Sequence, residues 1–301
     1  MMTKHFIDLD DHSFEDLQGI IDNAIALKKS HQSGEINESL KNKTLAMIFD
    51  KSSTRTRVSF EAGMTQLGGH SLFLSDKDIQ IGRGEPITDS AIVISSMVDA
   101  VMLRVSSHED IMAFAKHAST PVINALSDES HPCQMLADLM TYQEHRGSIK
   151  GKKVVWVGDG NNVCQTFMQA AEIFDFNLIV STPKGYQAAQ GFADKYQNNI
   201  SYCSNPVEAC KSADLVVTDV WASMGMESEQ KARELAFRDF QVNNEMMSVA
   251  NEDALFMHCL PAHRGEEVST EVIDGKQSVI WDEAENRLHA QKALLLFLMD
   301  S

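Results

Sequence analysis

The chain has 301 residues, of which 43% are hydrophobic, and this length suits two α/β domains of ordinary size. Its formal net charge of −17 at pH 7 argues against a nucleic-acid-binding protein and against one that is drawn to an anionic membrane surface. The longest apolar run near the C-terminus, Ala293 to Met299, is too short to cross a bilayer, and no secretory signal is expected. Five widely spaced cysteines without a Cys-x-x-Cys pair indicate reduced thiols, so we expect a cytoplasmic protein.

Short apolar runs alternate with longer helical patterns along the whole sequence. The elements predicted in the first half are, in chain order, helix 13–30, strand 44–49, helix 55–67, strand 71–74, helix 87–97, strand 99–103, helix 107–117, strand 121–124 and helix 131–146. The alternation restarts after 147–150, with strands predicted at 154–157, 177–181, 200–203, 214–218, 254–258 and 278–281 and a final helix at 284–299.

This alternation predicts an α/β protein with two doubly wound parallel-sheet domains, which the helix at 131–146 links. We assign residues 1–147 to the first domain and 148–283 to the second. The C-terminal helix, 284–301, is expected to return to the first domain.

Ligands of such sheets bind outside the carboxyl ends of the strands, and polar clusters follow most of the predicted strands. These clusters are Ser53-Thr54-Arg55-Thr56-Arg57, Arg104, His131-Pro132-Cys133-Gln134, Gly158-Asp159-Gly160-Asn161-Asn162, Asp219-Val220-Trp221-Ala222-Ser223-Met224-Gly225 and His258-Cys259-Leu260-Pro261-Ala262-His263-Arg264. Their shared position predicts binding sites at the strand ends.

The segment from Ser53 to Arg57 stands where a strand turns into a helix. Free backbone N–H groups and the helix dipole favour an anion there, and hydroxyl and guanidinium groups add donors. The segment lacks the glycine-rich loop and Gly-Lys-Ser/Thr ending of a nucleotide-binding loop, so a small phosphorylated molecule fits better than ATP. The alternative is an ordinary helix cap with solvated arginines.

The remaining clusters each leave a functional and an ordinary structural interpretation open. His131 can donate to a substrate carbonyl and Gln134 supplies an amide, or His131 caps a helix or lies in the core. Asn162 suits a polar substrate or a simple turn, because the glycine pattern before it is incomplete for a dinucleotide site. Asp219 suits a substrate ammonium group, and Ser223 lies in a loop that either closes over a ligand or is an ordinary surface turn.

The cluster at His258 and Cys259 allows a zinc site or a nucleophilic thiol, but its spacing is poor for a structural zinc site. A residue that contacts substrate is the favoured interpretation of Cys259.

Taken together, these segments resemble the aspartate/ornithine transcarbamoylase family along nearly the whole chain. The motifs STRTR and HPCQ mark the wider family, and DVWASMG with HCLP resembles its ornithine carbamoyltransferases. Other segments that match in order are Gln80-Ile81-Gly82-Arg83-Gly84-Glu85-Pro86, GDGNN and Glu283-Ala284-Glu285-Asn286-Arg287.

The resemblance implies transfer of the carbamoyl group from carbamoyl phosphate to the δ-amine of L-ornithine, which gives L-citrulline and phosphate in arginine biosynthesis. It implies neither a metal nor a cofactor. It also implies a homotrimer, or a multiple of trimers, with active sites at subunit interfaces.

Residue roles follow from the same resemblance. The residues implied to bind carbamoyl phosphate are Ser53, Thr54, Arg55, Thr56, Gln80 (in the site of a neighbouring subunit), Arg104, His131, Gln134, Cys259, Leu260 and Arg287. The catalytic group among them is Arg55, Arg104, His131, Cys259 and Arg287, and the residues implied to bind ornithine are Asn162, Asp219, Ser223 and Met224.

The sequence departs from the family pattern beside the expected ornithine site. Cys164-Gln165-Thr166 stands where Ala-Asn-Ser is common, and Asp50 stands where Glu is common. The near alternative is a sister transcarbamoylase that uses putrescine, lysine or an acylated ornithine. More distant alternatives are an NAD-dependent enzyme and a catalytically silent paralogue.

Overall fold

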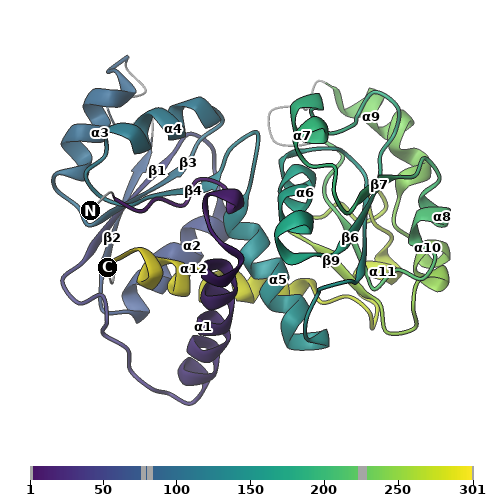
Figure 1. Cartoon of the computed structure of the whole chain (residues 1–301), viewed down its shortest axis with the longest axis horizontal. Helices are drawn as coiled ribbons and strands as arrows, with labels where there is room; N and C mark the ends of the chain where they lie inside the picture. The colour runs from purple at the N-terminus through teal and green to yellow at the C-terminus, as the bar shows by residue number, and fades with distance from the viewer. Residues whose placement is uncertain (1–2, 76–78, 80–83, 223–228, 300–301) are drawn as a thin grey trace. The chain divides into compact units, whose positions relative to one another are not determined.

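The computed structural model describes residues 3–75, 79, 84–222 and 229–299 (Figure 1). The chain divides into two compact units, of which the first contains residues 1–140 and 285–301 and the second contains residues 141–284. Two helices supply residues to both units, α5 (Pro132–Arg146) and α12 (Ile280–Met299). The predicted α/β fold class is confirmed, including the linking helix and the C-terminal helix that returns to the first unit.

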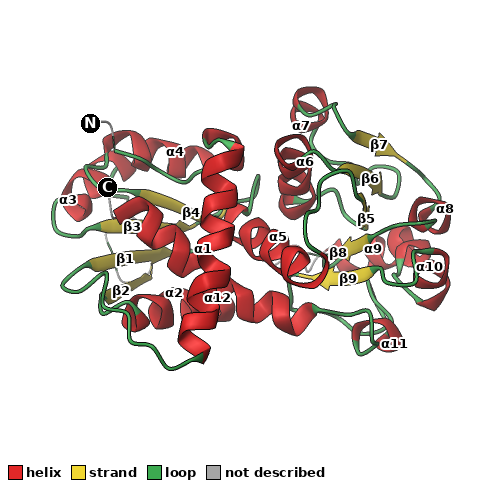
Figure 2. Ribbon diagram, turned by 60° about the horizontal axis from the view of Figure 1, so that its bottom comes forward, coloured by secondary structure: helices red, strands yellow, loops and turns green. Residues whose placement is uncertain are grey.

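The first unit contains a parallel sheet with the strand order β2-β1-β3-β4. Its strands are β1 (Thr44–Phe49), β2 (His70–Ser75), β3 (Ala100–Arg104) and β4 (Val122–Leu126). Its other helices are a short 3-10 helix (Leu9–Asp11), α1 (Phe14–Gln32), α2 (Thr54–Gln66), α3 (Ile87–Ser95) and α4 (His108–His117). Helices α3 and α4 cover one face of the sheet, and α1, α2 and α12 lie on the other (Figures 1 and 2).

The second unit contains a parallel sheet with the order β7-β6-β5-β8-β9. Its strands are β5 (Lys153–Val157), β6 (Asn177–Ser181), β7 (Ile200–Tyr202), β8 (Leu215–Thr218) and β9 (Leu255–His258). Its helices are α6 (Asn162–Phe174), α7 (Gln190–Lys195), α8 (Pro206–Cys210), α9 (Gln230–Phe237), a 3-10 helix (Arg238–Phe240), α10 (Asn244–Val249) and α11 (Thr270–Ile273).

Burial explains which apolar runs became central strands. The run from Leu45 to Phe49 is buried at every residue, as expected for a strand that has neighbours on both sides and helices on both faces. In contrast, β2 lies at the edge of its sheet, where Leu72 and Phe73 are exposed.

The predicted strand at 278–281 is wrong. Ser278 forms only an isolated bridge with Phe256, and helix α12 begins two residues later at Ile280. Asp282 and Glu283 lie in the first turn of that helix, where negative charge favours a helix start. The apolar residues Val279 and Ile280 therefore belong to a helix entry and not to a strand.

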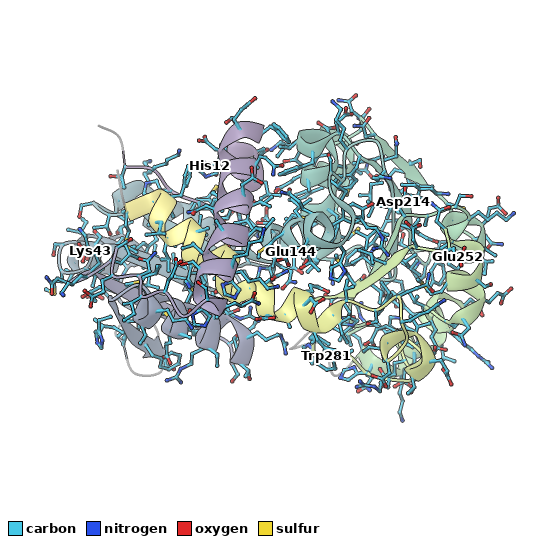
Figure 3. The ribbon with its side chains drawn as sticks, turned by 90° about the horizontal axis from the view of Figure 1, so that it is seen from below. His12, Lys43, Glu144, Asp214, Glu252 and Trp281 are labelled. Atoms are coloured by element: carbon cyan, nitrogen blue, oxygen red, sulfur yellow. The ribbon has the colours of Figure 1, made fainter. Side chains whose placement is uncertain are left out.

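A carboxylate ties the start of the central strand to a neighbouring strand in each sheet. Asp99 accepts a hydrogen bond from the backbone N–H of Thr44 at 2.8 Å and one from Lys43 Nζ at 3.0 Å. Asp214, labelled with Lys43 in Figure 3, accepts from the backbone N–H of Lys153 at 2.8 Å. The loops that carry the polar clusters follow the opposite, carboxyl ends of these strands.

Strands β1 and β5 each pair with a strand on both sides, and the direction in which the chain adds strands reverses there. Such reversal points leave a crevice at the carboxyl ends of the strands. The segments beginning at Ser53 and Gly158 directly follow these two strands. No helix in the described part of the chain is both long and apolar enough to span a bilayer.

Candidate active site

Helix α2 begins with a cap that differs from those of α1 and α4 in the same unit. Ser13 and Ser107 cap α1 and α4, because their side chains accept hydrogen bonds from the backbone N–H groups of Asp16 and Asp110. Within the described residues, the side chain of Ser53 accepts no such bond, although Ser53 has the extended backbone of an N-cap. The first-turn N–H groups of α2 can therefore be offered to an anion.

Two guanidinium groups converge on the side chain of Thr56 in the first turn of α2. The Thr56 hydroxyl oxygen accepts hydrogen bonds from Arg104 Nη1 at 3.2 Å and from Arg287 Nη2 at 3.3 Å. Arg104 ends β3 and is 8% exposed, whereas Arg287 lies on α12 and is 2% exposed. Two buried guanidinium groups thus lie close together, and their combined positive charge suits a site that binds an anion.

The amide of Gln134 extends this cluster. Arg287 Nη1 donates to Gln134 Oε1 at 2.6 Å, and Gln134 Nε2 donates to Asp138 Oδ1 at 2.8 Å. Gln134 and Asp138 lie one turn apart on α5 and are both buried. The side chain of Arg287 is thus held by residues from α2 and α5.

His131, immediately before α5, is 4% exposed. Burial is the main cause that holds the pKa of its imidazole well below the usual value, and the positive charges of Arg287, Arg104 and Arg55 lower it further. The ring is therefore neutral at pH 7 and can donate a single hydrogen bond to a ligand. The influence of these arginines also places His131 in the same cationic cluster.

Arg57 does not join this cluster. Its Nε donates to Glu61 at 3.0 Å, and its guanidinium lies 3.9 Å from the centre of the Phe73 ring. The alternative interpretation, a solvated arginine on a helix surface, holds for this residue.

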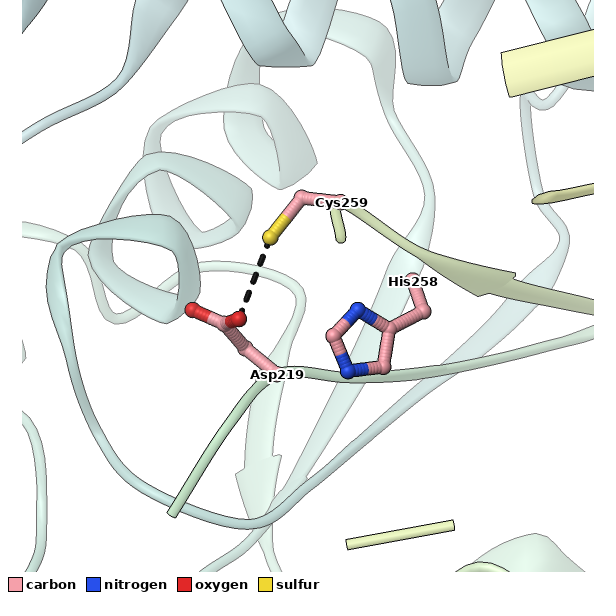
Figure 4. Close-up of side chains that lie close together, drawn as sticks. All are labelled: Asp219, His258 and Cys259. Carbon is pink, nitrogen blue, oxygen red and sulfur yellow. Dashed lines mark hydrogen bonds between the residues drawn. The ribbon is translucent and has the colours of Figure 1, made fainter. Parts of the chain in front are cut away.

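In the second unit, Asp219 accepts hydrogen bonds from three groups, of which the Cys259 thiol is drawn in Figure 4. Its Oδ1 accepts from the backbone N–H of Val220 at 2.8 Å and from Cys259 Sγ at 3.1 Å, and its Oδ2 accepts from Asn161 Nδ2 at 2.7 Å. Asp219 is 7% exposed, so these donors fix its orientation. The Cys259 thiol donates a proton in this contact, which is unlike the thiolate that a nucleophile requires.

The structure distinguishes the two asparagines that follow Gly160. Asn161 is the N-cap of α6, and its side chain accepts from the backbone N–H groups of Val163 and Cys164 while it donates to Asp219. Asn162, the residue predicted to bind substrate, is the first residue of α6 and is half-buried. Asn161 is not among the site residues predicted from the sequence, although asparagine directly before a helix is a strong cap signal.

Asp219, His258 and Cys259 offer ligand atoms that lie within 4.8 Å of one another. However, His258 Nδ1 accepts from the backbone N–H of Leu260 at 2.9 Å, and His258 Nε2 lies 3.1 Å from Glu267 Oε1. Both ring nitrogens are engaged, so these three residues do not fit a zinc site. Leu260 has a left-handed backbone (φ 58°) and a cis peptide bond to Pro261.

Arg233 on α9 is buried and is not among the residues predicted from the sequence. Its Nη1 donates to Asp159 Oδ2 and to the carbonyl oxygen of Trp221, each at 2.8 Å. Burial raises the pKa of the Asp159 carboxyl, while Arg233 opposes that rise. No motif surrounds Arg233, and 74 residues separate it from Asp159, so the sequence carried no signal of this pair.

The predicted residues Gln80, Ser223 and Met224 lie outside the described residues. The others separate by unit. Thr56, Arg104, Gln134 and Arg287 are joined by hydrogen bonds in the first unit, with His131 and Arg55 beside them electrostatically. Asp219 and Cys259 are joined by a hydrogen bond in the second unit, where Leu260 also follows β9 and Asn162 begins the helix after β5.

The protein is of the α/β class with two parallel sheets, and it places buried cations after the strands of one sheet and a fixed carboxylate after those of the other, where such sheets bind their ligands. Two family models match the chain. Residues 4–144 match the carbamoyl-P binding domain, and residues 150–298 match the Asp/Orn binding domain, of aspartate/ornithine carbamoyltransferase. The chain belongs to the aspartate/ornithine carbamoyltransferase family, and the resemblance seen in the sequence is confirmed.

Relatives match the chain over its full length. It is 67% identical to the ornithine carbamoyltransferase of Ruthia magnifica subsp. Calyptogena magnifica, over 99% of this chain and 100% of that protein. Among solved structures, it is similar to ornithine carbamoyltransferase from Burkholderia thailandensis (54% identity, TM-score 0.92, 98% of each chain). It is also similar to the enzyme from Pyrococcus furiosus (49% identity, TM-score 0.95, 99% of this chain and 97% of that one).

Proposed function

We propose that this protein transfers the carbamoyl group of carbamoyl phosphate to the δ-amine of L-ornithine, which gives L-citrulline and phosphate. Its family and the names of its full-length relatives support this reaction. The observation that carries the proposal is the convergence of Arg104 and Arg287 on Thr56 beside the start of α2.

In this proposal, the first unit binds carbamoyl phosphate. Ser53, Thr54 and Arg55 at the start of α2 hold the phosphate. Their hydrogen-bond donors stabilise the negative charge that develops on the leaving phosphate. The carbonyl oxygen becomes negative in the tetrahedral transition state. Thr56, Arg104 and neutral His131 stabilise that oxygen as donors, while Gln134 holds Arg287 in place.

The second unit binds ornithine in this proposal, and Asp219 pairs with its α-ammonium group. The hydrogen bonds from Val220, Cys259 and Asn161 hold the carboxylate in one orientation. Asn162, Ser223 and Met224 complete the contacts to the amino acid, and Cys259 and Leu260 contact the reacting groups.

The nucleophile is the δ-amine of ornithine, which attacks only when it is neutral. An alkylamine of this kind has a pKa of about 10.4 in water. Positive charge nearby favours its deprotonated form, and Arg55, Arg104 and Arg287 are the groups we assign to that effect. The amine nitrogen forms the new C–N bond and loses a proton, the C–O bond to phosphate breaks, and the departing phosphate can take up that proton. No covalent intermediate with the enzyme is required.

We also propose a homotrimer, or a multiple of trimers, in which Gln80 reaches the carbamoyl phosphate of a neighbouring subunit. Large apolar side chains that are exposed on the first unit support contact with a second copy. They are Val58 on α2, Leu72 and Phe73 on β2, and Ile92, Val93 and Met97 on or just after α3. The five free thiols suit a reducing compartment, so we place the enzyme in the cytoplasm, in arginine biosynthesis.

The test is citrulline formation from carbamoyl phosphate with L-ornithine, putrescine, L-lysine and N-acetylornithine offered in parallel. Turnover with ornithine alone is the expected result. Turnover with another amine would support the assigned carbamoyl phosphate site but contradict ornithine as the acceptor. No turnover with any amine would indicate a paralogue that binds ligands without catalysis. A titration with NADH, followed by its fluorescence, separately excludes or reveals a dinucleotide site.

A further inference from the structure

The turn between β9 and α11 gathers an imidazole and two carboxylates outside the proposed active site. His263 Nδ1 lies 3.6 Å from Glu266 Oε2 and 4.0 Å from Glu267 Oε2. One ligand atom from each of these residues lies within 4.8 Å of the other two. The backbone N–H of Glu266 donates to the carbonyl of His263 at 2.9 Å, so the turn itself holds this spacing.

Glu267 is the unusual member of the group, because its side chain is 0% exposed. Its Oε1 accepts from the backbone N–H of His263 at 2.6 Å and faces His258 Nε2 at 3.1 Å. Its Oε2 is also buried, yet it accepts no hydrogen bond from any residue in the described part of the chain. A buried carboxylate oxygen without a donor is costly, and here that oxygen is directed toward the His263 imidazole.

We propose that His263, Glu266 and Glu267 bind a divalent first-row transition metal ion of the Zn²⁺ type. Ligand atoms about 2.0–2.2 Å from a tetrahedral ion lie roughly 3.4 Å from one another. The two separations from His263 Nδ1, 3.6 and 4.0 Å, need to close by only tenths of an ångström, and the ligand atoms of Glu266 and Glu267 lie within 4.8 Å of each other. An imidazole with two carboxylates suits Zn²⁺ better than Ca²⁺ or Mg²⁺, which prefer oxygen ligands alone.

The surroundings of the site also match those of a metal centre. The Glu267 oxygen that does not face the ion is fixed by His258 and by the backbone of His263, as outer contacts commonly fix ligating carboxylates. The side chains of His263 and Glu266 are 52% and 35% exposed, so an ion can enter from solvent and keep a water ligand. A plain surface ion pair between His263 and Glu266 leaves the buried oxygen of Glu267 unexplained.

The experiment titrates the full-length chain with Co²⁺, which reports its ligands by absorption, and with Zn²⁺ by calorimetry. Cys259→Ser is the parent variant, because a thiol near Asp219 offers a competing soft ligand. We expect one equivalent of Co²⁺ to bind without a thiolate charge-transfer band. His263→Ala should weaken binding at least about tenfold, as should Glu266→Gln.

His117→Ala is the matched control, because His117 is also an exposed histidine but lies on α4 in the other unit. It should leave Co²⁺ affinity unchanged. Zn²⁺ should raise the melting temperature of the parent and of His117→Ala, but not that of His263→Ala, since an ion that binds the folded state stabilises it. Equal affinity in His263→Ala and the parent, or no saturable binding in the parent, overturns the proposal. Because both variants change exposed residues, their melting temperatures without metal should match the parent.

Discussion

Arg104 and Arg287 donate to the same hydroxyl oxygen, that of Thr56, although Arg104 precedes the second unit in the sequence and Arg287 follows it. The hydroxyl therefore sets the distance between two guanidinium groups. An anion that bridges them meets donors that are already placed, which lowers the cost of ordering the site on binding.

Thr56→Val tests this arrangement because it keeps the shape of the side chain and removes the shared oxygen. Hydrogen bonds to charged groups are worth about 1.5–3 kcal/mol, so we expect carbamoyl phosphate to bind roughly ten- to a hundredfold more weakly. Calorimetric titration measures the change. Thr65→Val, at an exposed position of the same helix, is the control and should bind normally. Unchanged binding by Thr56→Val would remove this hydroxyl from the site.

Asp219→Asn tests the acceptor side. The amide keeps an oxygen for Val220 and Cys259 but loses the negative charge, so we expect the KM for ornithine to rise at least about tenfold. The KM for carbamoyl phosphate should change by less than about twofold. Steady-state kinetics with each substrate varied in turn measures both, and Asp194→Asn, at an exposed position of α7, serves as the control. Equal rises in the two KM values would contradict the role assigned to Asp219.

Cys259→Ser distinguishes a positioning thiol from a nucleophile. A serine hydroxyl can still donate to Asp219 Oδ1, so we expect kcat to fall by no more than about tenfold. In Cys259→Val, whose side chain cannot donate a hydrogen bond, kcat should fall further than in Cys259→Ser. Removal of a true covalent nucleophile costs about 10⁴-fold or more, and a loss of that size in Cys259→Ser would show that the thiol attacks the substrate.

A buried histidine outside the proposed site predicts a pH-dependent stability. His108 Nε2 lies 3.2 Å from Asp8 Oδ2, and this hydrogen bond is the main cause that raises the pKa of the imidazole, against the effect of burial. His108 Nδ1 contacts Ser127 Oγ at 2.9 Å, and Glu129 and Asp11 add negative charge. Because the folded-state pKa is the higher one, the pair stabilises the fold fully below about pH 6.5, and this stabilisation is lost as the pH rises through the raised value.

The measurement is urea unfolding of the parent chain and of Asp8→Asn between pH 5 and 8.5. The free energy of unfolding of the chain without this substitution should exceed that of Asp8→Asn by the largest amount at pH 5, and the difference should shrink as the pH rises. Asp22→Asn, at an exposed position of α1, is the control. A constant difference across this range would mean that His108 does not titrate with Asp8.

Most of the fold could be predicted because each buried parallel strand is a short, continuous apolar run with a helical pattern after it. The error at 278–281 has the same origin, because Val279 and Ile280 are apolar for packing at a helix start. The motifs pointed to Thr56, Arg104, Gln134 and Arg287, but 231 residues separate Thr56 from Arg287, so their contact required the folded chain. Arg233 could not be found at all, since a buried ion pair has no sequence pattern of its own.

The first unit is built from both ends of the chain, because it contains residues 1–140 and 285–301, while the second is one continuous segment. During synthesis from the N-terminus, every residue of the second unit is added before Arg287. Domains generally fold as units, and the second unit needs no residue from the C-terminal segment to be complete. The contact between Arg287 and Thr56 must wait for the last helix, and a chain that stops short of α12 lacks one of the two guanidinium groups on Thr56.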